Sequence, residues 1–473
     1  MTDPAVARAG LVEFRAGLYR CFGRRADALF ELVDAVLTAD GPVASLVELS
    51  LENVFRRGHG ALYDAVACGE VDVAALATLI SRTWVPVDDG PVKIAMDVSA
   101  WPRPDAVTSE GRCHCYTACR CDGMRKTIPG WPFSFAAGLE WGASSWTAVL
   151  DAARIGPDDD ATVVTVAQIA AVVARLTAAG VLVGRPAAVF VFDSGYDLTR
   201  ITHLAGALGV QVLGRVRSDR VFYTPAPRRL RDGRPGRPKL HGDRFELSNP
   251  AALPTAEQTL SGHSSRYGAV EVSAWHGLHQ KLSSQGGWKG HVGALPIVAG
   301  TVIRIQVERL PGSRAPQDLW LWHTAPAGTV FDLDLLWKTY LRRFDVEHTF
   351  RFLKSVLGWT APQVRTPQQG ERWTWLILAA HAQLRLARTL TVDLRRRWEK
   401  TVAADRPMTP GRVRRGFPTL RRHLGTPARR PKPTIPGPGR PKGTTRPPRT
   451  RHGVGKTRSK VDRTDPTRHH VKG

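Results

Sequence analysis

The chain is short of acidic residues, of cysteine and of long apolar runs. It has 42 Asp and Glu against 67 Lys and Arg, which gives a formal net charge of +25. Such an excess of positive charge indicates a polyanionic partner. No stretch approaches the roughly 18 uninterrupted apolar residues of a membrane span, so we expect none. Acidic Asp3 and the lack of an apolar run near the N-terminus argue against a signal peptide, so we expect a cytoplasmic protein.

Four of the six cysteines lie in one short segment, CHCYTACRC. They are Cys113, Cys115, Cys119 and Cys121, and their C-x-C-x3-C-x-C pattern offers four thiolates for a structural Zn²⁺, although C-x2-C is the usual spacing. The alternative is a loop with reduced thiols between two strands. Disulfides are not expected in a cytoplasmic chain. The sequence leaves both interpretations open.

The positive charge is concentrated at the C-terminal end. Residues 406–473 hold 20 Lys or Arg and two acids, so they carry +18 of the total +25. Because few apolar residues follow Leu424, this segment cannot bury a core of its own, and we expect residues 401–473 to be largely disordered. A tail of this kind raises nonspecific affinity for DNA in a salt-dependent way.

Two carboxylates follow predicted strands. Residues 92–96 alternate between apolar and other side chains and lead into Asp97, while residues 187–192 are an unbroken apolar run that ends at Asp193. An Asp at the carboxyl end of a strand lies at the sheet edge, where open α/β sheets bind ligands. Asp197 is the better cap for the next helix, which leaves Asp193 available for a metal ion.

A third carboxylate lies in the segment YLRRFDVEHTFRFLK, residues 340–354, for which we predict one continuous helix. At about 100° per residue, positions 340, 343, 347 and 354 fall within about 60° of one another around the axis. Glu347 is therefore a candidate metal ligand, with Arg343 and Lys354 as phosphate ligands. The alternative is a solvated face with i,i+4 ion pairs. Two Asp and one Glu suit a pair of Mg²⁺ or Mn²⁺ ions about 4 Å apart.

The spacing Tyr340-x2-Arg343-x3-Glu347-x6-Lys354 resembles the YREK signature of DDE transposases of bacterial insertion sequences. In this resemblance, Asp97 and Asp193 match the first and second acids of the catalytic triad, and Glu347 matches the third. The resemblance covers roughly residues 91–397. It implies a bacterial enzyme, bound to the nucleoid when on DNA, that cuts transposon ends and joins the 3′ hydroxyls to target DNA. Because the two transposon ends must be held together, the resemblance also implies at least a dimer of the protein in the complex with DNA.

The expected fold is α/β, with a ribonuclease-H-like core, a β-rich insertion, a helical N-terminal region and a disordered basic C-terminal tail. The expected division is 1–90 helical, 91–216 first part of the core, 217–330 insertion, 331–400 core helices with the YREK motif, and 401–473 tail. The helical region either binds transposon ends or packs on the core. In the first case the arginines on phosphate are Arg24, Arg25, Arg56 and Arg57.

Further DNA contacts are predicted in the insertion. In some relatives of this group an insertion tryptophan stacks on a flipped base. Trp320 and Trp322, in DLWLWHT, are candidates, with Trp288 as the other. The alternative is that they are core aromatics. Arg234 and Arg237, in GRPGRPK, resemble an AT-hook that enters the minor groove, or make nonspecific phosphate contacts.

Two other functions are compatible with the same residues. One is a metal-dependent nuclease on the same fold that hydrolyses DNA without joining strands. The other is a noncatalytic DNA-binding protein derived from a transposase. Three carboxylates beside DNA repel phosphate unless a cation intervenes, which favours an enzyme over a DNA-binding regulator.

Overall fold

The computed structural model describes residues 3–118, 125–141, 144, 146–227, 239–311, 315–402, 406–433, 441–445 and 448–455. Contacts divide the chain into two compact units. The first contains the described residues of Met1–Gly156, Gln168–Ala188 and Leu341–Gly455, and the second those of Pro157–Ala167 and Val189–Tyr340. Each unit combines helices with strands, so the α/β class is confirmed. The units cut across the domain boundaries expected from the sequence, which remain a prediction.

The described strands of the first unit form an antiparallel sheet: β1 (Lys93–Pro102), β2 (Cys113–Ala118), β3 (Arg125–Leu139) and β4 (Thr147–Arg154). The long strand β3 pairs with β1 on one side and with β2 and β4 on the other. Asp97 lies opposite Phe135 in the middle of β1. The expectation that the strand ends at Asp97 is therefore wrong, because buried Ser99 and Trp101 continue the alternation to the end of β1.

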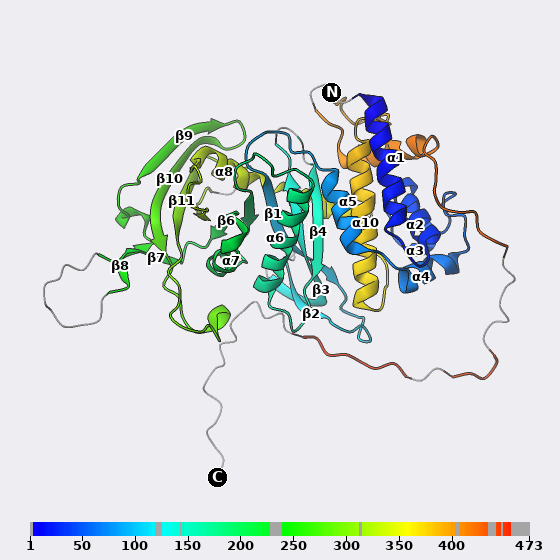
Figure 1. Ribbon diagram of the computed structural model, residues 1–473, viewed down its shortest axis with the longest axis horizontal. Coiled ribbons are helices and arrows are strands. Elements are labelled where there is room, and N and C mark those ends of the chain that lie inside the picture. The colour runs from blue at the N-terminus through cyan, green and yellow to red at the C-terminus, as the bar shows by residue number, and fades with distance from the viewer. Residues whose placement is uncertain are drawn as a thin grey trace, which may run out of the picture. The chain divides into compact units, whose positions relative to one another are not determined.

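Helices pack beside this sheet in the first unit: α1 (Pro4–Arg20), α2 (Ala26–Thr38), α3 (Leu46–Leu49), α4 (His59–Cys68), α5 (Val73–Arg82), α9 (Asp345–Ser355), α10 (Pro367–Ala387) and α11 (Pro410–Arg421). The central helix is α10, which is buried along most of its length and packs against α1, α2 and β4 (Figure 1). Its first turn is fixed by a capping box, in which the side chains of Thr366 and Gln369 bind each other's backbone N–H groups.

A buried ion-pair cluster joins three of these helices. Arg15 of α1 donates to Asp34 of α2 at 2.6 Å, and Arg421 of α11 reaches the same carboxylate at 2.8 Å. Arg15 also donates to Gln383 of α10. Because Asp34 is almost fully buried, loss of either arginine would leave its charge poorly compensated.

The C-terminal segment is more ordered than the sequence predicts. In α11, Val413 and Phe417 are fully buried, so the expectation of a largely disordered tail is wrong for this helix. Farther on, the backbone N–H of Gly455 donates to the carbonyl of Arg112, and His114 N–H donates to the Gly455 carbonyl. Basic composition predicted disorder, but apolar side chains of α11 and backbone pairing with β2 supply enough contacts to hold these parts.

The second unit is rich in strands: β5 (Val189–Phe192), β6 (Gln211–Val216), β7 (Val221–Pro225), β8 (His241–Glu246), β9 (Gln258–Ser264), β10 (Gly268–His279), β11 (Ala299–Val307) and β12 (Leu319–Thr324). The pairing order is β5-β6-β12-β11-β10-β7-β8, with β9 also on β10. The pair β5 and β6 is parallel and the other pairs are antiparallel. The unit also holds α7 (Leu198–Leu204), short 3-10 turns at Gly206–Leu208, Pro250–Ala252 and Gly286–Trp288, and most of α8 (Leu333–Arg342).

Helix α6 (Ala161–Ala178) follows β4 in the chain. In its C-terminal part, Gln168 bonds to Ser134 of β3 and to Asp151 of β4, and Arg175 pairs with Asp151. This part therefore packs on the sheet of the first unit. Among the described residues, α6 is the one helix that is long and apolar enough to cross a bilayer by length and composition alone, a property it shares with core helices of soluble proteins.

Gly138 in β3 provides a test of the packing in the first unit. A Cβ atom at this position would lie 2.4 Å from the ring of Trp84, which is itself buried. We predict that Gly138→Ala lowers the free energy of unfolding by about 1–3 kcal/mol, measured by urea denaturation. Gly10→Ala is the matched control: it lies within α1 with no atom near its Cβ position, and should be neutral or stabilising by up to about 1 kcal/mol. Equal midpoints for Gly138→Ala and the parent protein would contradict this packing.

Candidate functional site

The segment that contains Tyr340 and Glu347 forms two helices, α8 and α9, and the prediction of one continuous helix is wrong. Between them, Phe344 N–H donates to the carbonyl of Leu341 at 3.2 Å, and at the start of α9 Val346 N–H donates to that of Arg343 at 3.1 Å. These i→i−3 bonds tighten the backbone relative to an α-helix. The angles calculated for a single helix therefore do not apply across Arg343. Glu347 and Lys354 remain on one flank of α9, because seven residues are close to two full turns.

Asp97 and Arg343 form an ion pair inside the first unit. The Nη1 atom of Arg343 lies 3.1 Å from Oδ2 of Asp97, and the N–H of Val98 donates to Oδ1 at 2.8 Å. Arg343 is 5% exposed, and the side chain of Asp97 is 17% exposed. The two residues are 246 positions apart, so no local sequence pattern reveals this pair.

Helix α9 is fixed by a buried face that packs on the sheet. Phe350 contacts Phe135 of β3 with ring centroids 5.1 Å apart, and the hydroxyl of Thr349 hydrogen-bonds to that of Thr147 in β4. The fully buried Leu353 lies on the same face. Glu347, beside this face, is exposed to solvent. The helix thus presents a carboxylate from a rigid support.

Lys354 lies within electrostatic range of both carboxylates of the first unit. Burial lowers the pKa of its ammonium group, and the negative charges of Glu347 and Asp97 oppose that shift. Its Nζ atom also lies 5.6 Å from the centroid of the buried Trp359 ring. Asp97, Arg343, Glu347 and Lys354 therefore form one cluster of two acids and two cations. The sequence predicted that these residue types would meet, and the structure brings these four together.

The other two predicted residues belong to the second unit. Asp193 follows the fully buried strand β5 directly, as predicted, and the hydroxyl of Tyr340 donates to its Oδ1 at 3.4 Å. Asp197 is the N-cap of α7, as predicted, where its side chain accepts from Arg200 N–H. Tyr340 is 7% exposed, so its ring is a packed support with its hydroxyl directed at Asp193.

The carboxylates have the oxygen donors that Mg²⁺ and Mn²⁺ prefer, and Asp97, Asp193 and Glu347 all retain solvent exposure. Their chemistry therefore fits a divalent ion. Among the described residues, however, no group of three or more His, Cys, Asp or Glu side chains is positioned to hold a metal. The three acids are divided between the two units, and their convergence stays a prediction.

Trp320 does not serve as a surface for DNA. It is 2% exposed, pairs with Arg304 and Val216 across β11 and β6, and lies 6.1 Å from the ring of Trp275. The prediction that it stacks on a base is wrong, because its strand lies inside a sheet and its ring is in the core. Trp322 is 1% exposed and Trp288 is also largely buried. Arg234 and Arg237 lie outside the described residues.

Half of the cysteine cluster is described. Cys113 and Cys115 are buried reduced thiols on β2, and burial raises the pKa of Cys115 to about 12. Cys115 is therefore a protonated thiol at neutral pH unless a metal displaces its proton. Cys119 and Cys121 lie outside the described residues, so the zinc site stays a prediction.

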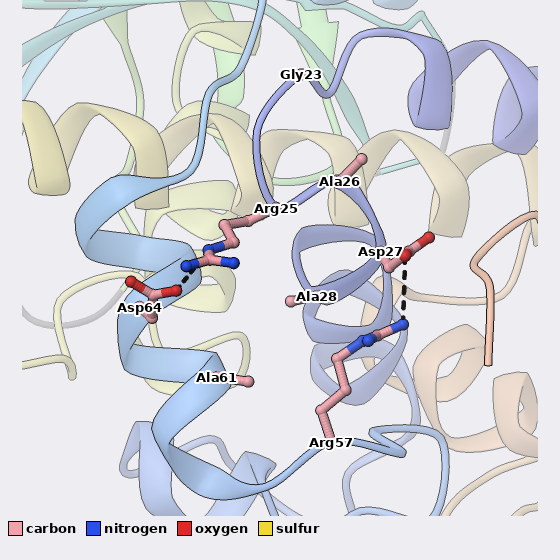
Figure 2. A pocket seen from close by; sticks show the side chains of 8 residues that line it. All are labelled: Gly23, Arg25, Ala26, Asp27, Ala28, Arg57, Ala61 and Asp64. Atoms are coloured by element: carbon pink, nitrogen blue, oxygen red, sulfur yellow. Dashed lines mark ion pairs between the residues drawn. The ribbon is translucent and has the colours of Figure 1, made fainter. Parts of the chain in front are cut away.

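Arginines of the N-terminal region line a small hollow at the start of α2. Figure 2 shows Arg25 paired with Asp64 and Arg57 paired with Asp27 across it. Arg57 also pairs with the buried Glu31. These cations are already neutralised by neighbouring carboxylates, which favours a role in packing over the alternative role in binding phosphate.

The cluster in the first unit predicts a measurable coupling. In Glu347→Gln the pKa of Lys354 should fall further, because the variant removes an anion that favours the ammonium form. Titration followed by NMR of lysines labelled at Cε would measure this shift. Lys338, which pairs with Asp334 on α8, serves as the internal control and should not move. An unchanged Lys354 pKa in Glu347→Gln would show that the two side chains are not neighbours in solution.

Comparison with known families gave one finding. The family model described as DDE superfamily endonuclease matches residues 17–281, which is 265 of the 473 residues. The matched region includes Asp97 and Asp193 and ends before Tyr340. No curated protein matched the chain.

Proposed function

The chain belongs to the DDE superfamily endonucleases, and on this premise we propose that it is a transposase of the YREK group. Membership of the family makes it a nucleic-acid-cleaving enzyme with DNA as its substrate. The finer proposal is that it cuts insertion-sequence ends and joins their 3′ hydroxyls to target DNA. The observation that carries it is the signature of Tyr340, Arg343, Glu347 and Lys354, because these residue types in this spacing define that group. The contacts of Arg343 and Lys354 with Asp97 add a further carboxylate beside it.

The order of elements supports a ribonuclease-H-like core. Three antiparallel strands, β1, β3 and β4, are followed by helix α6, strand β5, helix α7 and strand β6, and β5 and β6 are parallel. This is the order that such a core requires, with β2 as an addition and β7–β12 as the insertion before the helix that carries Glu347. In the proposal, the core brings Asp193 beside Asp97 and Glu347.

The chain's own residues have distinct tasks in this proposal. Asp97, Asp193 and Glu347 would hold the divalent ions, and Tyr340 orients Asp193 through its hydroxyl. Arg343 and Lys354 supply positive charge to the phosphate that is cut, where charge-assisted hydrogen bonds are strong. Arg343 also neutralises Asp97 before DNA binds, since the two already form an ion pair.

Members of the DDE nuclease superfamily generally use divalent metals. Two Mg²⁺ or Mn²⁺ ions bound by these carboxylates would supply activation of the attacking oxygen and charge stabilisation of the leaving oxygen. Lys354 lies within electrostatic range of Asp97 and Glu347, so one cation accompanies two of the three carboxylates.

We further propose that two copies act together on two DNA ends and that the enzyme works in the cytoplasm on nucleoid DNA. An enzyme that only hydrolyses DNA would use the same carboxylates. The reaction products distinguish the two enzymes. A nuclease yields nicked or cut DNA, whereas a transposase also yields a strand joined to target DNA.

The carboxylates provide the main test. Asp97→Asn and Glu347→Gln should each lower cleavage of labelled DNA that carries the flanking repeats by roughly 10³-fold or more in Mg²⁺. Binding of the same DNA in EDTA should remain largely intact. Gel analysis would separate nicked, hairpin and joined products. Full cleavage by either variant would refute the proposed site, and cleavage without joined product would identify a nuclease.

Arg343 allows a second test. Arg343→Ala should lower cleavage by about 10- to 100-fold, less than loss of a carboxylate, because it removes one phosphate ligand and leaves the metal ligands in place. Arg351→Ala is the matched control, since Arg351 lies on the exposed side of α9. A cleavage rate equal to that of the parent protein would remove Arg343 from the site, provided that the melting temperature is also unchanged.

A further inference from the structure

A tryptophan projects from the loop between α10 and α11 in the first unit. Trp398 is 78% exposed, whereas the large aromatic side chains of this unit's core are almost fully buried. Most of the surface of its side chain therefore faces solvent. The ring is therefore accessible to a ligand.

The residues directly before the ring are three arginines, Arg395, Arg396 and Arg397, and all three are exposed. The guanidinium of Arg396 lies over the indole, 5.5 Å from its centroid. A cation on one face leaves the opposite face for a flat ligand. Aromatic rings next to exposed cations are the combination that binds nucleic acid bases by stacking and the backbone by charge.

Two arginines of α11 hold this loop in place. Arg415 donates to both oxygens of Glu399 at 2.6 and 2.8 Å and to the carbonyl of Leu394. Arg412 donates to Asp393 at 2.9 Å. Hydrogen bonds from Arg415 and from the backbone N–H of Arg396 lower the pKa of Glu399 to about 2, so its carboxylate remains charged above that pH.

This bracing has two consequences for binding. The loop's acids, Asp393 and Glu399, are neutralised by α11, which leaves the positive charge of residues 395–397 facing solvent. In addition, a loop that is held before binding loses less conformational entropy when a ligand arrives. The sequence RRRWEK shows the basic run and the tryptophan, but only the contacts with Arg412 and Arg415 show that they form a supported surface.

We propose that Trp398 and Arg395–Arg397 form a binding site for DNA with unpaired bases, in which one base stacks on the indole and the arginines hold adjacent phosphates. This proposal rests on DNA being the substrate and deepens the proposed function. Exposed Val392 and Leu394 lie nearby, which would also suit an apolar protein surface. The charge of the site, with its acids already paired, favours a polyanion.

The test measures affinity of the full chain for labelled oligonucleotides of unrelated sequence in EDTA, so that no cleavage occurs. Trp398→Leu removes the stacking ring and should weaken binding to single-stranded DNA by about 5- to 150-fold, with a smaller effect on blunt duplex. Trp398→Phe retains an aromatic face and should keep most of the affinity. Tyr63→Leu, which removes another exposed aromatic of the same unit, is the matched control.

The salt dependence separates the two parts of the site. Replacing Arg396 and Arg397 by Gln should reduce the slope of log affinity against log salt by about one for each phosphate that the variant no longer neutralises, whereas Trp398→Leu should leave the slope unchanged. Equal affinity of Trp398→Leu and the parent protein for single strands would overturn the proposal, as would an equal loss on single strands and duplex. Because these measurements need no cleavage, they stand apart from the carboxylate variants that test the catalytic site.

Discussion

The ion pair between Asp97 and Arg343 is the interaction on which the candidate site depends. Asp97 lies in the middle of β1, and Arg343 lies in the turn where α8 ends and α9 has not yet begun. Because the arginine is buried, it has few alternative positions, and the tightened turn around it sets the direction of α9. The places of Glu347 and Lys354 follow from that direction and from the packing of Phe350 and Leu353 on the sheet.

The cluster of two acids and two cations suits a protein that binds DNA. Carboxylates near a phosphate backbone are repelled by it, so a site of this kind must carry its own positive charge. In the first unit, the guanidinium of Arg343 and the ammonium of Lys354 supply that charge at short range. Burial makes the ammonium of Lys354 more costly to keep charged, and the neighbouring acids reduce that cost. The opposite charges therefore lower the free-energy cost of burying one another.

Several other arginines of the first unit form internal ion pairs that support its structure. The arginines of α11 are an example: Arg421 joins a buried ion pair with Asp34, while Arg412 and Arg415 brace the loop that carries Trp398. A net positive charge therefore does not identify which arginines meet a ligand. The candidates are those that remain exposed after the internal carboxylates have been paired, and residues 395–397 meet this condition whereas Arg25 and Arg57 do not.

The sequence by itself determined the residue types of the site, the strand that precedes Asp193 and the cap at Asp197, because these depend on local periodicity and spacing. Tertiary structure decided the rest. Trp320 is a core residue because strands distant in sequence flank it, the helix divides at Arg343 where a distant carboxylate binds the side chain, and α11 folds because α2 and α10 bury its apolar face. Contacts between residues hundreds of positions apart leave no trace in a local pattern, and their energies override local preference.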